Sequence, residues 1–490
     1  MPVASLGTLP ADVLLNIFSV STPASIRVCR HVCRTFKQLI STTDHLQYLL
    51  ALDTCGYVEP LCPRTDLSYA QKKQILFDHW NRWYNPSSDE LVTSHELPTG
   101  KGRVEASAKG TTIWSPEGTM GYMFFQNPSN NRGVGLKKWN FRPDSYGYSI
   151  AINPELNLLA VLDEQYTIRL LTATTLERHP KSPMLPIVFN HDGANTFGTT
   201  WGDGIELFGS LIVGVFAMDQ RVMISTLVIW NWATGQEVMR LLVKTSRHNQ
   251  RRLNRIFDFV SEDTLVVCRR FDPTEALAQS LPGNTFGLLD IYKFDPLAVL
   301  PATLVASLAL PANIIKGETE TPAVYFSSSP YIPPSLQPQV WETSPGTRTL
   351  CVSIDGMHRW ENVCVQAKTL LGYGGGTTSN SIIRWDEWGP QAAWDKWDGP
   401  ISKGSNRIKT QGHRIISMKC LWIAKEIEVN FFELERTQDG QIAPALKAKF
   451  VVGPDMSQPN GGEALNTGPR TEIDMNDECI MMFRETLSSD

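Results

Sequence analysis

The feature that most constrains the fold of this chain is a change of hydrophobic period near residue 103. Before that point, apolar residues recur every three or four positions, as on one face of a helix. After it, short apolar runs alternate with turn residues, as in a series of short strands. The pattern predicts a multidomain protein, with a small all-α segment followed by a large all-β domain.

Composition allows a sizeable core and excludes several classes of protein. Of the 490 residues, 42% are apolar and 19% are charged, so the chain is not globally disordered. The formal net charge of −5 is too balanced for a general nucleic-acid binder. The longest apolar stretch, Leu207 to Met218, contains two glycines and is too short to span a membrane. We therefore expect neither a nucleic-acid nor a membrane partner.

The cysteines and the N-terminus predict the compartment. The nine cysteines are odd in number and mostly lie inside apolar runs, as Cys268 does. This usage fits buried thiols in a reducing compartment better than a disulfide framework. Residues 1–7 have neither the charged nor the apolar region of a secretory signal. We expect an intracellular protein of the cytoplasm, the nucleus or both.

The first fifty residues predict short amphipathic helices. Pro10 suits the first helical position, where its missing N–H is not needed, and Asp12 places a negative charge in the first turn. Thr22-Pro23 repeats this start signal. From Cys29 to Ile40, apolar residues follow at helical spacing, which predicts one continuous helix. Residues 41–44 end that helix and cap another.

These residues resemble the F-box motif, and the resemblance covers about residues 5–50. Its first block is Leu9-Pro10, Asp12-Val13-Leu14 and Ile17-Phe18, and its second is Val32-Cys33-Arg34 and Phe36-Lys37-Gln38-Leu39-Ile40. The interval from Leu9 to Val32 matches the family spacing. Ser21 departs from the family, which usually has a leucine there.

The resemblance implies that residues 1–50 form a small helical bundle that docks a Skp-type adaptor and, through it, a cullin and a RING subunit. Such a small bundle buries too little surface to be robust alone, which makes exposed apolar residues facing a partner reasonable. The residues implied to hold the adaptor are Leu9, Pro10, Leu14, Ile17, Phe18, Val32 and Phe36. The alternative is an ordinary helical hairpin packed on the rest of the chain.

Residues 51–102 predict a helical linker. Ser68 and Gln71 have the spacing of a capping box, and Pro86 ends the helix that follows. Trp80 and Trp83 fall on one face of this helix, so we expect them to be core residues of a bridge to the C-terminal domain. Within this region, the connection from the helix to the C-terminal domain is predicted at residues 87–102.

Residues 103–490 predict a β-propeller-like domain. Three hairpins are expected, from Leu158–Leu162 with Thr167–Leu171, from Leu227–Asn231 with Gln236–Val238, and from Leu265–Cys268 with Leu288–Tyr292. The middle hairpin resembles a degenerate WD repeat, with Trp230-Asn231 where that family has Trp-Asp. An irregular repeat of turns and strands favours roughly six to eight propeller blades. A pair of β-sandwiches is the structural alternative.

Two groups of residues are candidates for binding a target protein. Arg251 and Arg252 lie in the one basic run, where arginine forks suit an acidic or phosphorylated peptide. Trp388 and Trp394 belong to a cluster of tryptophans that follows the glycine-rich residues 372–376, which are expected to form a loop. The alternatives are a solvated loop for the arginines and blade packing for the tryptophans.

No pattern predicts catalysis. Cys29, His31 and Cys33 do not converge as zinc ligands would, and no cofactor motif is present, so we expect no metal site and no cofactor. The hypothesis is a non-catalytic substrate receptor of an SCF-type ubiquitin ligase that binds an adaptor and an unknown protein substrate. The alternative is an adaptor-bound scaffold, or an orphan F-box protein, without a ligase function. A third hypothesis, a propeller enzyme with an accidental helix pair, lacks intact Asp-boxes or a ligand cluster.

Overall fold

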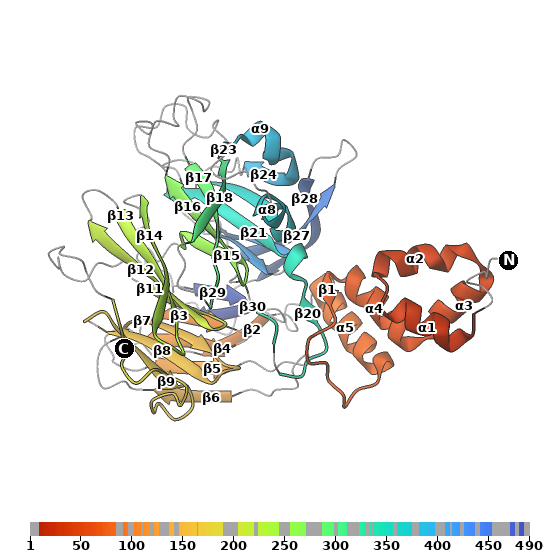
Figure 1. The fold of residues 1–490 in the computed structure, drawn as a ribbon, viewed down its shortest axis with the longest axis horizontal. Coiled ribbons are helices and arrows are strands. Elements are labelled where there is room, and N and C mark those ends of the chain that lie inside the picture. Colours follow the sequence, from red (N-terminus) through yellow and green to blue (C-terminus); the bar gives the residue numbers. More distant parts are fainter. Residues whose placement is uncertain are drawn as a thin grey trace, which may run out of the picture. The chain divides into compact units, whose positions relative to one another are not determined.

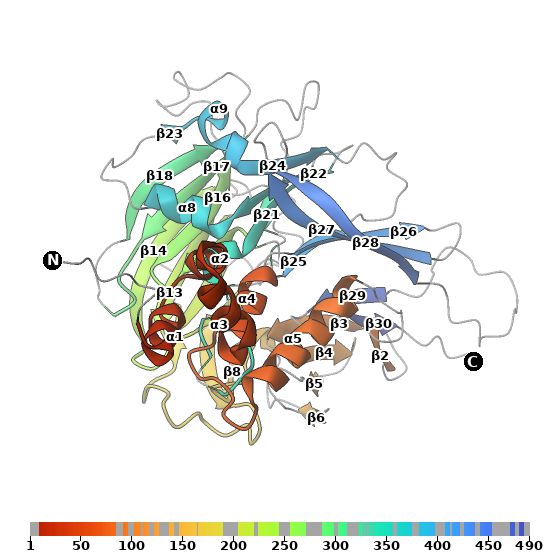
Figure 2. The same ribbon diagram turned by 90° about the vertical axis from the view of Figure 1, so that its right-hand side faces the viewer.

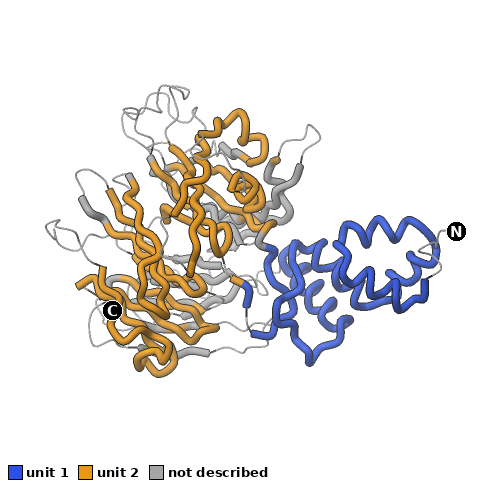
Figure 3. Tube along the Cα trace, in the orientation of Figure 1, with its two compact units in different colours: residues 1–87, 128–135, 334–344 blue, residues 88–127, 136–333, 345–490 orange. Residues whose placement is uncertain are grey.

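The protein forms two compact units, shown in Figure 3. The first comprises residues 1–87, 128–135 and 334–344, and the second comprises residues 88–127, 136–333 and 345–490. The computed structural model describes residues 9–84, 92–96, 102–108, 111–116, 122–126, 137–141, 147–163, 165–189, 204–219, 224–244, 255–270, 287–297, 302–310, 323–326, 328, 331, 333–335, 337–355, 360–374, 382–396, 407–411, 414–421, 426–436, 442–452, 471–475 and 480–484.

The first unit is built on helices that follow one another along the chain (Figure 1). Their bounds are α1 Ala11–Ser19, α2 Pro23–Val32, α3 Arg34–Thr42, α4 Asp44–Thr54 and α5 Tyr69–Tyr84. The start signals act as expected, because Thr22 Oγ1 accepts a hydrogen bond from Ser25 N at 3.2 Å and Pro23 occupies the first turn of α2. The helical N-terminal segment is thus confirmed.

The stretch from Cys29 to Ile40 was predicted to be one helix, and this prediction is wrong. Cys33 has an extended backbone, with φ −154° and ψ 166°, and separates α2 from α3. Its Sγ accepts a hydrogen bond from Phe36 N at 3.4 Å and so caps α3. The apolar spacing continued across the break, because two short helices in succession can keep nearly the same period.

Helix α5 begins at the predicted capping box. Ser68 N donates to Gln71 Oε1 at 2.8 Å, and Gln71 N donates to Ser68 Oγ at 3.2 Å. A two-stranded sheet completes the first unit, formed by β1 (Tyr57–Val58) and β20 (Glu342–Thr343), which pair antiparallel. Strand β20 lies in residues 334–344, far along the chain from the helices it joins.

The second unit is a succession of sheets. Five of them have four antiparallel strands each. The first consists of β3 Gly102–Ala108, β4 Thr111–Pro116, β5 Tyr122–Gln126 and β6 Lys137–Phe141, and the second of β7 Gly147–Asn153, β8 Leu158–Asp163, β9 Thr167–Thr172 and β10 Ile187–Val188. The third consists of β11 Gly204–Phe208, β12 Leu211–Asp219, β13 Ile224–Asn231 and β14 Gln236–Lys244, the fourth of β19 Ala323–Phe326, β21 Thr349–Asp355, β22 Trp360–Gln366 and β24 Ala392–Lys396, and the fifth of β25 Arg407–Gln411, β26 Arg414–Leu421, β27 Glu426–Arg436 and β28 Ile442–Val452. Figure 2 shows the long β27 and β28 side by side.

Two further sheets belong to this unit. One has the order β15-β16-β17-β18-β23, with bounds Phe257–Ser261, Thr264–Arg270, Gly287–Lys293, Thr303–Ala309 and Ile382–Ile383. The other has the order β2-β30-β29, with bounds Val92–Glu96, Ile480–Arg484 and Thr471–Met475. Two short helices, α8 (Ala367–Gly374) and α9 (Trp385–Trp388), follow β22. The described part of this unit therefore holds seven sheets.

The three predicted hairpins are confirmed. Strand β8 pairs with β9, β13 with β14, and β16 with β17, all antiparallel. In the WD-like hairpin, Asn231 Oδ1 accepts hydrogen bonds from Ala233 N at 3.1 Å and Thr234 N at 3.2 Å. Asn231 thus organises the turn, and Gly235 closes it with a φ of +75°.

The core lies between successive sheets, which is the arrangement of propeller blades. Along β12 and β13, Ile212 and Trp230 pack toward the sheet of β7–β10, whereas Val213 and Ile229 pack toward the sheet of β15–β18. One sheet thus shares a core with the sheet before it and another with the sheet after it. A sandwich pair has a single core between two sheets, so the β-rich region has the organisation of a β-propeller.

Two expected boundaries differ from the structure. Strand β2 lies in the predicted linker and pairs in parallel with β30, so the second unit begins before residue 103. The glycine-rich residues from 372 were expected to form a loop, yet α8 extends to Gly374. In both cases the partners are distant in sequence: β30 for β2, and Ile291 and Leu308 in the cluster that buries Leu370 of α8. No helix in the described ranges is long and apolar enough to cross a membrane.

Candidate interaction surface on the N-terminal helices

The first four helices enclose a small core. Phe18 of α1 and Phe36 of α3 meet edge to face, with ring centroids 5.3 Å apart and planes at 82°. The buried members of this core are Leu14, Phe18, Ile26, Phe36, Ile40, Leu46 and Leu50. Because these residues come from four separate helices, the core fixes the positions of α1, α2, α3 and α4 relative to one another.

The same helices leave several apolar side chains exposed to solvent. The exposed fractions are 38% for Val13, 38% for Ile17, 87% for Val20, 67% for Val28 and 64% for Val32. In α1, Val13 and Ile17 are four residues apart and share a face, as Val28 and Val32 do in α2. We name these five residues the apolar face. Exposed apolar side chains that recur along one side of a helix are candidate contacts for a partner protein.

The residues implied to hold an adaptor divide into two groups. Leu14, Phe18 and Phe36 are buried in the core of the helices, and Leu9 is partly buried against that core. Pro10, Ile17 and Val32 are exposed. The first group can act on a partner only by holding the helices in place, whereas the second group is accessible to direct contact.

The charged side chains of α2 and α3 are all basic. Between Asp12 and Asp44 the sequence has no acidic residue. Arg27 forms an ion pair with Asp53 at 2.5 Å, and the other exposed basic side chains of α2 and α3 are Arg30, His31, Arg34 and Lys37. A partner that covers Val28 and Val32 of α2 would lie close to the basic residues of the same helix, and such exposed charge mainly affects the association rate.

Helix α4 has a second buried face, which the sequence did not predict. Tyr48, Leu52 and Cys55 pack on α5 and on residues of the 334–344 segment. From that segment, Val340 and Trp341 are 0% and 1% exposed. The available signal was a lone Val-Trp pair within an otherwise polar, proline-rich stretch, which is typical of an apolar anchor.

The residues predicted to bind a target lie in or near the second unit. Trp388 is fully buried, and its Nε1 donates to Ala309 O at 2.8 Å. Its ring meets Trp385 edge to face at 4.7 Å, so Trp388 packs within a blade as the alternative held. Trp394 lies in β24 opposite Val363. Arg251 and Arg252 lie outside the described residues.

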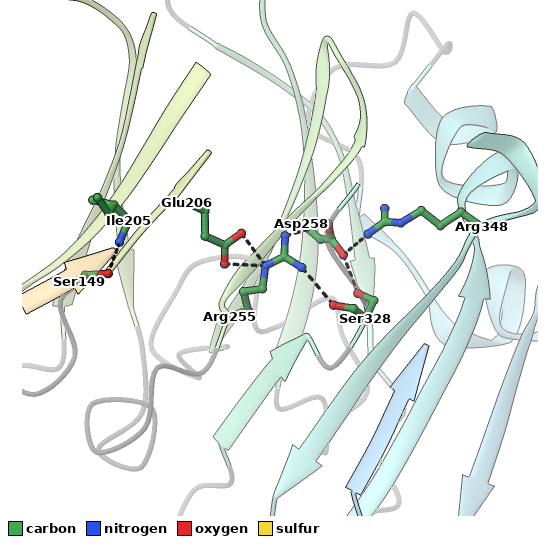
Figure 4. Close-up of polar contacts among 7 residues, drawn as sticks. All are labelled: Ser149, Ile205, Glu206, Arg255, Asp258, Ser328 and Arg348. Carbon is green, nitrogen blue, oxygen red and sulfur yellow. Dashed lines mark hydrogen bonds and ion pairs between the residues drawn. The ribbon is translucent and has the colours of Figure 1, made fainter. Parts of the chain in front are cut away.

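A buried polar network joins neighbouring sheets of the second unit (Figure 4). Asp258 of β15 accepts from Arg348 Nη2 at 2.7 Å and from Ser328 Oγ at 2.5 Å, and lies 3.3 Å from Arg255 Nη2. Arg255 Nε also donates to Glu206 of β11 at 2.9 Å. The paired charges compensate one another, which fits a structural link between sheets rather than a ligand site. The signal in the sequence was an aspartate between two phenylalanines of a strand.

Residues 6–48 match the F-box-like family. The comparison with curated proteins gives no match. Among solved structures, the chain is similar to Kluyveromyces lactis Hsv2p, with 11% identity over 72% of this chain and 99% of that one, at a TM-score of 0.34.

Two other solved structures have a similar level of likeness. One is the β-propeller domain of Cps50 (Swd1) from Myceliophteria thermophila, with 11% identity over 73% of this chain and 86% of that one, at a TM-score of 0.37. The other is the set of WD40 repeats of RRP9, with 9% identity over 71% of this chain and 84% of that one, at a TM-score of 0.35.

Proposed function

We propose that this chain, whose residues 6–48 are F-box-like, is a non-catalytic substrate receptor of an intracellular SCF-type ubiquitin ligase. Its N-terminal helices bind a Skp-type adaptor, which links to a cullin and a RING subunit. Its β-rich unit binds a target protein. The chain acts by proximity, because it raises the effective concentration of target lysines near the ubiquitin-loaded partner.

The observation that carries this proposal is the apolar face. The core of the helices is formed by Leu14, Phe18 and the residues around them, and it includes neither Ile17 nor Val32. Their exposure costs free energy in the isolated protein and is recovered when a partner covers them. The match of residues 6–48 to the F-box-like family supports a Skp-type adaptor as that partner.

The proposal assigns roles within the helices. Pro10, Ile17 and Val32 contact the adaptor directly, because their side chains are exposed. Leu14, Phe18 and Phe36 hold α1 and α3 so that the contact residues are correctly spaced, and Leu9 closes the edge of the core.

For the target, Arg251, Arg252 and Trp394 are the proposed contacts. Trp388 supports the sheet that holds Trp394, since its ring is buried in the cluster that includes Ala392 of β24 and its Nε1 is hydrogen-bonded. An acidic or phosphorylated segment is the target chemistry that the two arginines favour.

The proposal is tested by measuring the binding of a purified Skp-type adaptor to the full chain. We expect Ile17→Asp and Val32→Asp each to weaken binding by about a hundredfold, because an unpaired carboxylate would be buried at the centre of the interface. Leu242→Asp is the matched control, since Leu242 is 70% exposed but lies in β14 of the other unit. It should bind as the wild type does.

If the wild-type chain fails to bind the adaptor, the ligase proposal is wrong. Binding that survives both aspartate variants would show that the adaptor uses a different surface. A chain that binds the adaptor but fails to bring a cullin with it would favour the scaffold instead of the ligase receptor.

A further inference from the structure

Residues 334–344 leave one sheet of the second unit and return to it. They lie between β19 and β21, which are neighbours in the same sheet. Yet the segment belongs to the first unit, together with the helices. A connection between adjacent strands needs only a few residues, so the length and placement of this segment call for a physical reason.

Backbone hydrogen bonds attach the segment to the residues after α4. Gln339 N donates to Cys62 O at 3.0 Å, and Arg64 N donates to Gln339 O at 3.1 Å. Next to this pair, β20 continues as an antiparallel ladder on β1. Glu342 Oε1 accepts from Ser335 N and from Gln339 Nε2, both at 2.6 Å, and so closes the segment on itself. The segment is therefore an ordered part of the helical unit.

Side chains also anchor the segment to the helices. The Trp341 ring lies 4.7 Å from the His79 ring of α5 and 5.6 Å from the Tyr57 ring, measured between centroids. The Tyr48 hydroxyl of α4 donates to the carbonyl oxygen of Val340. Burial raises the pKa of Tyr48, so this hydroxyl keeps its proton and remains a donor throughout the ordinary pH range.

Helix α4 connects this anchor to the apolar face. Leu46 and Leu50 of α4 pack in the core with Phe18 and Phe36, which hold α1 and α3. Tyr48 and the residues near it pack in the cluster that contains Trp341. One rigid helix of eleven residues thus takes part in both clusters. Loss of packing on one side of α4 removes support from the other side.

We propose that residues 334–344 are a positioning segment for the apolar face and that Trp341 is its principal anchor. The part that concerns the adaptor rests on the proposed function, whereas the part that concerns the helices does not. The segment supplies one wall of the helical unit, so that the docking helices reach their bound arrangement only when residues 334–344 are in place.

The experiment compares full-length wild type with Trp341→Ala by hydrogen exchange of backbone amides. Because Trp341→Ala would leave a large cavity against α4 and α5, we expect amide exchange in α4 to rise by about a hundredfold. The decisive readout is exchange in α1, α2 and α3, none of which contributes a residue to the Trp341 cluster. It should also rise, because α4 transmits the loss.

Trp388→Ala is the matched control. Trp388 is as deeply buried as Trp341 but lies in the core of the second unit. It should raise exchange in α8, β17 and β18 and leave α1–α4 unchanged. If Trp341→Ala raises exchange only in α5 and β1, Trp341 is a local packing residue and the proposal is overturned. Unchanged exchange in α4 would overturn it as well.

Adaptor binding gives a second readout. Trp341→Ala should weaken the adaptor by about tenfold, and Trp341→Phe, which keeps an aromatic ring in the cavity, should restore most of the affinity. Adaptor affinity unchanged by Trp341→Ala would overturn the positioning role. A wild-type chain that binds no adaptor would defeat the proposed function, and the exchange experiment would still decide whether the segment supports the helices.

Discussion

Asp258 carries a buried negative charge that its neighbours compensate. Its side chain is completely buried, and two arginines and a serine hydroxyl surround its carboxylate. Arg348 also donates to Phe259 O at 2.6 Å, so its side chain is fixed at both ends of the guanidinium. Charged groups at such depth are tolerated only when they are paired.

Removing the carboxylate should therefore destabilise the β-rich unit strongly. We expect Asp258→Ala to lower the free energy of unfolding by about 3–5 kcal/mol, because Arg255 and Arg348 would stay buried with less compensating charge. Glu237→Ala is the control, since Glu237 pairs with Arg240 at 2.7 Å in a largely exposed ion pair. It should change stability by less than about 1 kcal/mol. Urea unfolding followed by tryptophan fluorescence measures the stability of both variants beside wild type. If Asp258→Ala unfolds at the same urea concentration as wild type, the buried network does not stabilise the β-rich unit.

At the scale of elements, the aromatic side chains of β12 and β13 leave no room for a side chain at Gly214. In β12, a Cβ on Gly214 would lie 2.4 Å from Phe216 Cε2 and 3.0 Å from Trp230 Cζ3. The Phe216 ring cannot easily move away, because it is fully buried and stacks on Phe189 with centroids 4.0 Å apart. Gly214 is thus required by space rather than by backbone conformation.

Gly214→Ala should cost about 1–3 kcal/mol of stability through overpacking. Gly372→Ala is the matched substitution in α8, where a new Cβ would meet nothing within 4 Å. There the change should stabilise the protein by about 0.5–1 kcal/mol, because alanine is the better helix former. Thermal unfolding of the two variants beside wild type measures both signs. A Gly214→Ala variant as stable as wild type would show that the Phe216 ring has room to shift.

At the scale of the whole molecule, the β-rich unit joins its first and last strands. Strand β2 near the start of that unit pairs in parallel with β30 at its end, and β29 follows on the other side. The hydrogen bonds of β2 to the sheet therefore depend on residues almost four hundred positions away. In this sheet β30 is the central strand, so it holds both β2 and β29.

Deleting residues 471–490, which carry β29 and β30, should remove the partner of β2. We expect the backbone amides of residues 92–96 to lose their protection from hydrogen exchange, whereas the amides of β13 and β14 keep theirs. The truncated chain should also aggregate more readily, because the backbone N–H and C=O groups of β2 are left without their strand partner. If residues 92–96 remain protected after the truncation, β2 does not depend on β30.

The sequence alone was sufficient where local chemistry decides. The helix starts at Pro23 and Ser68 and the three hairpins follow from caps, turns and hydrophobic period. Each of these signals acts within a few residues, so it is visible in a short window of sequence. The order of helices first and strands afterwards was predictable for the same reason. The F-box-like segment was identified from its resemblance to a family motif.

Tertiary structure decided the rest. Leu14 is buried in the core whereas Ile17 is exposed, although the two residues are only three positions apart and both are apolar. The burial of Trp388 depends on Ala309, the pairing of β2 depends on β30, and the second face of α4 depends on Trp341. In each case the deciding partner is distant along the chain, and a periodic pattern shows that a face is apolar without showing what covers it.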